Sequence, residues 1–357
     1  AHFDGEYERS LESVVAGVRM RAPMMHIHTV AAGGGSVLVF DGARFRVGPE
    51  SAGANPGPAC YRRGGPLAVT DCNVMLGKIQ PEFFPHVFGP NADEMLDADV
   101  VRQKFIEMSE KIAASTGENP RSPEDVAEGF LTIAVENMAN AIKQISVQRG
   151  YDVSNYVLNC FGGAGGQHAC LVADALGMKT VFVHPFAGVL SAYGMGLADV
   201  RALREQSADG ALNDETLKSL AAPLDDMAAD AAREVTSQGI SEDALKTLKR
   251  AHLRYEGTDS SIEVTVADAK AMQEEFETLH RQRFGFVPEG RGLVIEALTV
   301  EVIGITESTI DPELNDPKRT EPIPILANVK MHSGNEKHDT PVYNREDFLT
   351  DDVVDGP

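Results

Sequence analysis

The sequence predicts an α/β fold followed by a smaller α+β subdomain. A short apolar strand over 156–161, a glycine run, a helix over 167–176 and a second strand over 180–183 follow one another. This order is typical of parallel strands joined by a crossover helix. Between 249 and 305, two strands, a helix and a long strand follow, which is the order of an α+β unit. The 357 residues, 43% of them hydrophobic, suffice for two or three domains.

The first fifty residues are predicted to form strands and turns. Val14–Met20 alternates between apolar and polar residues, as a half-buried strand does. Val37–Phe40 and Arg44–Val47 flank Asp41-Gly42, which is typical of a hairpin turn. The segment 48–66 is so rich in Gly and Pro that it predicts a long loop without regular structure.

Two helices are predicted next, over 98–118 and 123–148. Ser122 is suited to the N-cap of the second helix, and Pro123 to its first position. Gly150 is expected to end it. The helix carries one apolar stripe, formed by Val126, Phe130, Ile133, Met138, Ile142 and Ile145.

The α+β subdomain is predicted to begin with a long acidic helix over 212–238. Its other elements are two paired strands, a helix and a long alternating strand, at Lys249–Tyr255, Ser261–Val266, Asp268–Arg283 and Leu293–Ile305. The Pro-rich, polar residues 308–350 are interpreted as a linker or the start of a further domain.

Composition excludes several classes of protein. The net charge of −22, with no block of Lys or Arg, argues against binding to nucleic acid or an anionic membrane. No signal peptide opens the chain, and no apolar run approaches the roughly 20 residues that span a bilayer. The four cysteines, Cys60, Cys72, Cys160 and Cys170, form no C-x-x-C pair and suit a reducing compartment. A cytoplasmic location is therefore expected.

The glycine turn Gly162–Gly166, followed by His168, is the first candidate site. Glycines between a buried strand and a helix N-terminus let an anion or the edge of a nucleotide approach the backbone. The spacing fits neither a dinucleotide fingerprint nor a phosphate-binding P-loop. Tight packing of helix on sheet is the alternative explanation of the glycines, and His168 could equally be a polar packing partner.

The second candidate site lies around His26, His28 and the glycines that follow. Histidines two apart on a strand point the same way and could bind a metal, with Asp71 as third ligand, or act as acid and base. A hydrogen-bonded histidine pair without a metal is the alternative, and we predict no metal ligands. Cys60, in the loop Gly48–Tyr61, lacks any sign of an activating base, which favours a buried structural thiol over a nucleophile.

These segments together resemble the hydantoinase A/5-oxoprolinase family. The resemblance covers about residues 1–310 and rests on His28–Ser36, Val47–Tyr61, Val69–Asn73, Phe161–His168 and His184–Asp199. Leu253–Asp259 and Phe83–Pro90 are more similar to oxoprolinases than to N-methylhydantoinases. Relatives often carry Asp where this chain has His26, which weakens a metal site there.

The resemblance implies an actin-like, ribonuclease H-like ATPase fold, of which this chain would be an internal piece. It implies a second lobe at 1–205, an inserted α+β subdomain at 206–310, and a linker or C-terminal domain start at 311–357. The adenosine would lie against Gly162, Gly163, Ala164, Gly165 and Gly166, with His168 beside it. The phosphate-binding D-x-G-G-T turns of such folds do not occur in these residues; by resemblance, one would directly precede Ala1.

The implied reaction is ATP-driven cleavage of a cyclic amide, in oxoprolinases 5-oxo-L-proline plus ATP and water to L-glutamate, ADP and phosphate. ATP with Mg²⁺, a lactam or imide substrate, a hydantoinase B-type subunit or domain, and self-association are the expected partners. The candidate catalytic residues are His28 and Asp71. A substrate or interface loop is expected at Gly33, Gly34, Gly35, Ser36, Glu50 and Ser51. An N-methylhydantoinase-type subunit and a nucleotide-binding piece without turnover are the alternatives.

Overall fold

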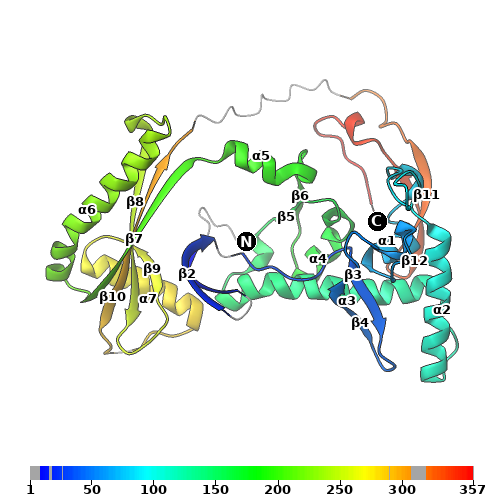
Figure 1. The fold of residues 1–357 in the computed structure, drawn as a ribbon, viewed down its shortest axis with the longest axis horizontal. Helices are drawn as coiled ribbons and strands as arrows, with labels where there is room; N and C mark the ends of the chain where they lie inside the picture. Colours follow the sequence, from blue (N-terminus) through cyan, green and yellow to red (C-terminus); the bar gives the residue numbers. More distant parts are fainter. Residues whose placement is uncertain (1–8, 16–17, 26, 289, 307–318, 357) are drawn as a thin grey trace. The chain divides into compact units, whose positions relative to one another are not determined.

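The computed structural model describes residues 9–15, 18–25, 27–288, 290–306 and 319–356. Internal contacts divide the chain into two compact units (Figure 1). Unit 1 comprises residues 1–147, 152–188 and 313–357, and unit 2 comprises 148–151 and 189–312. The fold is mixed α/β. Among the described residues, no helix is both long and apolar enough to cross a membrane.

Unit 1 begins with two antiparallel hairpins. β1 (Arg9–Val15) pairs with β2 (Val18–Met25), so the prediction of one continuous strand over Val14–Met20 was wrong. β3 (Ser36–Phe40) pairs with β4 (Phe45–Ser51), with Phe40 opposite Phe45, which confirms the hairpin predicted around Asp41-Gly42. β4 extends into the predicted Gly- and Pro-rich loop as far as Ser51.

Three helices form the core of unit 1: α1 (Val69–Met75), α2 (Ala98–Thr116) and α3 (Pro123–Ile145). The Ser122 hydroxyl accepts the Asp125 N–H at 3.0 Å, as predicted for an N-cap. The prediction that Gly150 ends α3 was wrong, because the helical residues stop at Ile145. The largest fully buried side chains here are Phe105 and Phe130, in one cluster with residues of all three helices.

The predicted strand–turn–helix–strand order is confirmed. β5 (Leu158–Cys160) and β6 (Val181–Val183) are parallel, and α4 (Ala169–Leu176) lies between them in sequence and ends at Gly177 with φ 68°. β5 is shorter than the predicted 156–161, and a 3₁₀ turn, Val153–Asn155, precedes it.

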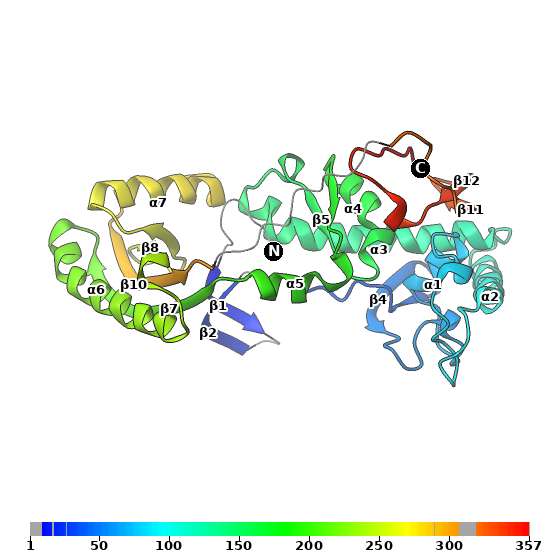
Figure 2. The same ribbon diagram turned by 90° about the horizontal axis from the view of Figure 1, so that it is seen from above.

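An antiparallel hairpin that sequence reasoning did not foresee, β11 (Ala327–Ser333) with β12 (Glu336–Val342), also belongs to unit 1. Figures 1 and 2 both show it near the end of α3 that adjoins α2. The His332 N–H donates to the Leu76 carbonyl at 2.7 Å, so the hairpin packs against the end of α1.

Unit 2 is an antiparallel sheet with the strand order β7-β10-β8-β9. Apolar residues of α6 and α7 share one cluster with those of the strands, so both helices cover the same face of the sheet. The paired strands, the helix and the long strand predicted between 249 and 305 are confirmed. The elements are α5 (Leu190–Leu197), β7 (Val200–Ala211), α6 (Asp214–Ser237), β8 (Leu245–Tyr255), β9 (Ile262–Thr265), α7 (Ala269–Phe284) and β10 (Leu293–Gly304).

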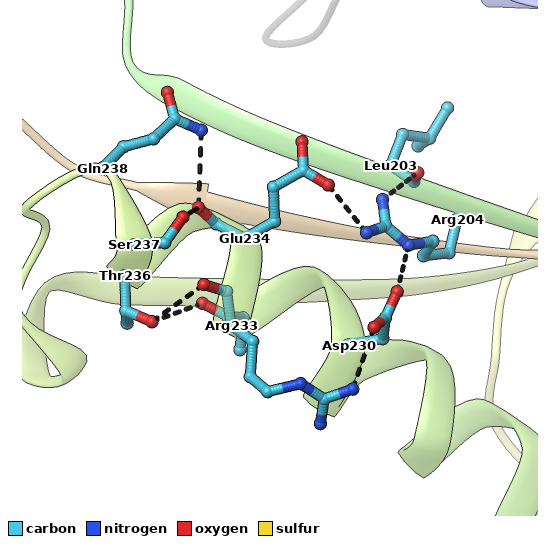
Figure 3. Close-up of polar contacts among 9 residues, drawn as sticks. Leu203, Arg204, Asp230, Arg233, Glu234, Thr236, Ser237 and Gln238 are labelled. Atoms are coloured by element: carbon cyan, nitrogen blue, oxygen red, sulfur yellow. Dashed lines mark hydrogen bonds and ion pairs between the residues drawn. The ribbon is translucent and has the colours of Figure 1, made fainter.

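β7 was not predicted, because its sequence is polar and charged. Arg204 faces α6, where its Nε donates to Asp230 at 2.6 Å and its Nη2 to Glu234 at 2.7 Å (Figure 3). These bonds lower the pKa of Asp230. On β7, Arg204 therefore contacts α6 through ion pairs. An alternating strand would have an apolar side chain at this position.

Candidate functional site

Asp71 lies fully buried in the first turn of α1 and binds three backbone N–H groups. Its Oδ2 accepts from Ala68 at 2.8 Å and Ala59 at 3.0 Å, and its Oδ1 accepts from Cys60 at 2.9 Å. Burial raises the pKa of the Asp71 carboxyl, and the bonds from Cys60, Ala68 and Ala59 oppose that rise. The carboxylate therefore fastens the Gly- and Pro-rich loop to α1.

The glycine turn Gly33–Ser36 is held by α1. The Gly34 carbonyl accepts from the Thr70 N–H at 2.8 Å and the Thr70 hydroxyl at 3.0 Å. A Cβ at Gly34 would stand 2.6 Å from the Thr70 hydroxyl and 4.0 Å from the Cβ of Ala164. The turn Gly33–Ser36 thus meets the turn Gly162–Gly166 beside Thr70, as two segments about 130 residues apart in sequence.

Ser51, the last residue of β4, borders the same turn on its other side and pairs with Ser36. The Gly35 carbonyl accepts the Ala52 N–H at 2.8 Å, and a Cβ at Gly35 would stand 2.8 Å from the Ser51 hydroxyl. Glu50 is exposed. A side chain at position 35 would therefore displace the Ser51 hydroxyl, because the end of β4 approaches the turn closely.

The turn Gly162–Gly166 presents open backbone. Gly162 has φ 88°, which favours glycine, and its N–H donates to the Ala187 carbonyl at 2.9 Å. At Gly162, Gly163 and Gly166, no heavy atom of the described residues other than the glycine and its chain neighbours lies within 4 Å of the position a Cβ would take, whereas a Cβ at Gly165 would stand 2.9 Å from Cys160 Sγ. The backbone is therefore exposed at Gly162, Gly163 and Gly166 and closely packed at Gly165, so the binding of a nucleotide to this turn stays a prediction.

His168, just after this turn, is buried beside Asn73 of α1. The Asn73 Nδ2 donates to Gln167 Oε1 at 2.8 Å and lies 3.4 Å from His168 Nε2. Burial, and to a lesser degree the charge of Lys78, lowers the pKa of His168 to about 4, so its ring is neutral near pH 7.

Two polar atoms of this pair have no hydrogen-bond partner in the described part of the chain. They are His168 Nδ1 and Asn73 Oδ1, both buried. Buried polar atoms usually have partners, so this pair, enclosed by the protein behind the turn Gly162–Gly166, is an exception within the described residues.

His28 lies away from this cluster and is exposed. It borders a cleft of about 620 Å³ between β4 and the C-terminal half of α3. No contact joins His28 to the buried Asp71, so the structure does not bring the two candidate catalytic residues together. Their catalytic roles stay predictions.

The metal alternative receives no support from the described residues. Among them, no group of three His, Cys, Asp or Glu side chains is arranged to hold a metal ion. Both oxygens of Asp71 are already bound to backbone N–H groups. His26 lies outside the described residues.

Cys60, as predicted, is a buried thiol. It has no exposed surface, and burial together with the neighbouring Asp71 raises its pKa far above the ordinary value. A thiol held protonated is a poor nucleophile. No disulfide joins the four cysteines.

The sequence analysis did not identify a set of interacting polar residues formed by Lys78, Glu128 and the β11–β12 hairpin. Burial lowers the pKa of Lys78, and the carboxylate of Glu128 opposes that change. Glu128 accepts from His332 Nε2 at 3.0 Å, from the Gly334 N–H at 2.8 Å and from the Asn335 N–H at 3.2 Å. No local pattern marks these residues, because they meet only in the folded chain. Asn73 and Thr70 do lie within the Val69–Asn73 motif and could have been singled out.

Known proteins share this sequence and fold. A family model described as Hydantoinase/oxoprolinase matches residues 1–204. The chain is 38% identical to 5-oxoprolinase 1 of Arabidopsis thaliana. The match covers all of this chain and 29% of the plant protein. It is 30% identical to caprolactamase subunit alpha of Pseudomonas jessenii, over 95% of the chain and 49% of the subunit.

Solved structures agree. The crystal structure of the ATP-dependent caprolactamase from Pseudomonas jessenii matches with a TM-score of 0.81 and 27% identity, over 94% of this chain and 49% of that one. The structure of a nucleotide-free acetone carboxylase matches with a TM-score of 0.67 and 22% identity, over 99% of this chain and 51% of that chain. At this identity the match shows a shared fold alone. The chain spans less than a third of the plant oxoprolinase and about half of the two solved chains. The predicted resemblance is confirmed, and the chain belongs to the hydantoinase/oxoprolinase family.

Proposed function

We propose that this chain is part of an ATP-dependent hydrolase of cyclic amides, and that its substrate is 5-oxo-L-proline. The observation that carries the proposal is the meeting of the turns Gly33–Ser36 and Gly162–Gly166 beside Thr70, next to the neutral, buried His168. The names of the plant relative and of the ATP-dependent caprolactamase support both the substrate class and the nucleotide.

In this proposal the turn Gly162–Gly166 and His168 hold the adenosine end of ATP, in an actin-like second lobe at 1–205. Residues 206–310 form the inserted subdomain, and 311–357 lead toward a C-terminal domain. ATP would transfer a phosphoryl group to the amide oxygen, which activates the carbonyl carbon. One water then adds to that carbon and the C–N bond breaks to free the amine, and a second water releases phosphate from the acyl phosphate that remains. Mg²⁺ accompanies the nucleotide as its counter-ion, and we assign no residue to it.

Asp71 takes a positioning role in this proposal, because its two oxygens already hold the loop at Ala59 and Cys60. His28 remains the candidate acid or base, since it borders the cleft beside the turn Gly33–Ser36. The relative named as a subunit alpha supports a second, hydantoinase B-type subunit in the active assembly. Self-association is a further part of the proposal.

The decisive experiment measures ATP turnover by the intact protein that contains this chain, together with its partner subunit. We expect 5-oxo-L-proline to stimulate turnover and hydantoin to have no effect. Stimulation by hydantoin alone would favour an N-methylhydantoinase-type activity. Nucleotide binding without turnover under any of these conditions would favour a non-catalytic role.

A further inference from the structure

Helix α7 carries acidic residues in its first half and basic residues in its last turn. Glu274 and Glu277 precede Thr278, which lies near the middle of the helix, and Arg281 and Arg283 follow it. All of these side chains are exposed except Glu277, which is half-buried. The helix therefore presents to solvent a surface that is negative at one end and positive at the other.

These charges contribute little to the fold of unit 2. Within the described residues, neither Arg281 nor Arg283 forms an ion pair. Glu274 lies 3.7 Å from Lys270, but the two side chains are 68% and 86% exposed, and surface pairs of this kind add little stability. The order of the charges suits the helix dipole. The dipole does not account for the aromatic residues that lie at the basic end.

Two exposed phenylalanines, Phe284 and Phe286, mark this end of α7. They are 41% and 58% exposed. Gly285, with φ 84°, ends the helix and turns the chain back, so that the Phe286 carbonyl accepts a hydrogen bond from His280 Nδ1 at 2.7 Å. The His280 ring centroid lies 4.6 Å from that of Phe284 and 5.4 Å from that of Phe286. Both aromatic side chains are thus held in place although they face solvent.

An ordered, exposed cluster of aromatic and Arg side chains is typical of a protein–protein interface, where these residues contribute most of the binding energy. The Arg283 guanidinium lies 5.4 Å from the centroid of the Phe284 ring. His280 packs in turn against Tyr255 and Phe276, which are buried, with ring centroids 5.1 and 5.7 Å away. Because the cluster is already ordered, its side chains lose little conformational freedom when a partner docks.

The charge pattern of α7 fits a second copy of this chain. A two-fold axis brings the same surface together from both copies, so each charged end must meet its complement. Two α7 helices in antiparallel orientation meet this requirement, because the acidic half of one lies against the basic turn of the other. An acidic protein would complement the basic turn alone, and a nucleic acid or an anionic membrane would be repelled by the acidic half.

We propose that two copies of this chain associate through α7, with the helices antiparallel about a two-fold axis near Thr278. Arg281 and Arg283 of each copy then lie opposite Glu274 and Glu277 of the other. The aromatic end of each copy covers the first half of the other helix and loses exposed apolar surface. The small side chain of Thr278 lets the helix axes approach to about 8–10 Å. This inference rests on the self-association included in the proposed function and names its surface.

The test is sedimentation velocity on this chain and on two charge-reversed variants. Arg281→Glu/Arg283→Glu makes both halves of the surface acidic, and Glu274→Arg/Glu277→Arg makes both basic. The unmodified chain should sediment as a dimer at micromolar concentration. Each variant alone should dimerise about tenfold more weakly, because like charges then face each other. An equimolar mixture of the two variants should recover the dimer, since every facing pair of charges is then attractive.

Two further variants separate the surface from general effects. Glu107→Arg/Glu110→Arg, at exposed positions of α2, makes the same change in net charge as Glu274→Arg/Glu277→Arg and should dimerise like the unmodified chain. Phe284→Ser/Phe286→Ser should weaken the dimer about tenfold through the loss of buried apolar surface. Circular dichroism should show the same helix content in all variants.

Dimers that survive charge reversal, or a mixture that associates no better than the separate variants, would overturn the assignment to α7 and leave self-association standing. A monomeric unmodified chain would overturn both. The proposed hydrolase activity fails differently, through ATP turnover in the intact protein that does not respond to 5-oxo-L-proline.

Discussion

Asp71 is the residue at which a structural and a catalytic role can be separated. Asp71→Asn replaces one acceptor oxygen with an NH₂ donor facing backbone N–H groups of Ala59, Ala68 or Cys60. Because a buried donor is then left without a partner, we expect a loss of roughly 3 kcal/mol in the free energy of unfolding. Urea denaturation measures it, with the exposed Asp93→Asn as control. Normal stability together with lost turnover in the intact protein would instead support catalysis.

His168 gives a pH-dependent prediction. Its pKa is about 4 in the folded chain and 6.5 in the unfolded chain, so the unfolded state binds more protons between these values. The free energy of unfolding therefore falls as the pH drops through this window. Between pH 7 and pH 5 the loss should be about 2 kcal/mol.

His168→Gln removes this contribution, so its denaturation curves at pH 7 and pH 5 should differ by that much less than those of the unmodified chain. His86→Gln, at an exposed histidine, serves as the control and should leave the pH dependence unchanged. An equal pH dependence in His168→Gln and the unmodified chain would show that His168 is not buried in its neutral form.

At the scale of elements, Glu128 fastens the β11–β12 hairpin to α3 through Gly334, Asn335 and His332. Glu128→Gln leaves a single neutral oxygen for three donors. We expect amide hydrogen exchange over 332–342 to quicken about tenfold, because the hairpin opens locally more often. Glu136→Gln on the same helix should leave that exchange unchanged. Equal exchange in both variants would assign the attachment to the His332–Leu76 backbone bond instead.

At the scale of the whole molecule, each unit has its own hydrophobic core. Phe276 is fully buried in unit 2, and Phe130 in unit 1. Phe276→Ala should destabilise unit 2 by about 3–5 kcal/mol and leave unit 1 nearly unaffected, and Phe130→Ala should do the reverse. Because the chain has no Trp, hydrogen exchange followed by mass spectrometry is the suitable measurement. A loss of protection in both units from either variant would show one cooperative unit.

Local sequence patterns were sufficient for the elements whose stability is local. The Ser122 cap, the turn at Asp41-Gly42 and the stop at Gly177 were all predictable, because the residues involved are neighbours in sequence. The Gly162–Gly166 turn could be singled out for the same reason: glycines between a strand and a helix mark an open backbone.

Other features depend on contacts between distant residues. β7 lacks an apolar alternation because Arg204 pairs with Asp230 and Glu234 of α6, about 30 residues further along. The roles of Glu128 and His332 were invisible because 204 residues separate them. Local periodicity cannot report a partner that only the folded chain supplies.

The sequence by itself determined the family, the order of helices and strands and the positions of the glycine turns, because each of these depends on residues that are neighbours in sequence. Only the tertiary structure decided that Asp71 is buried and His28 exposed, and that two glycine turns meet at Thr70. The physical reason is that burial and the pairing of polar groups depend on which distant segments pack together.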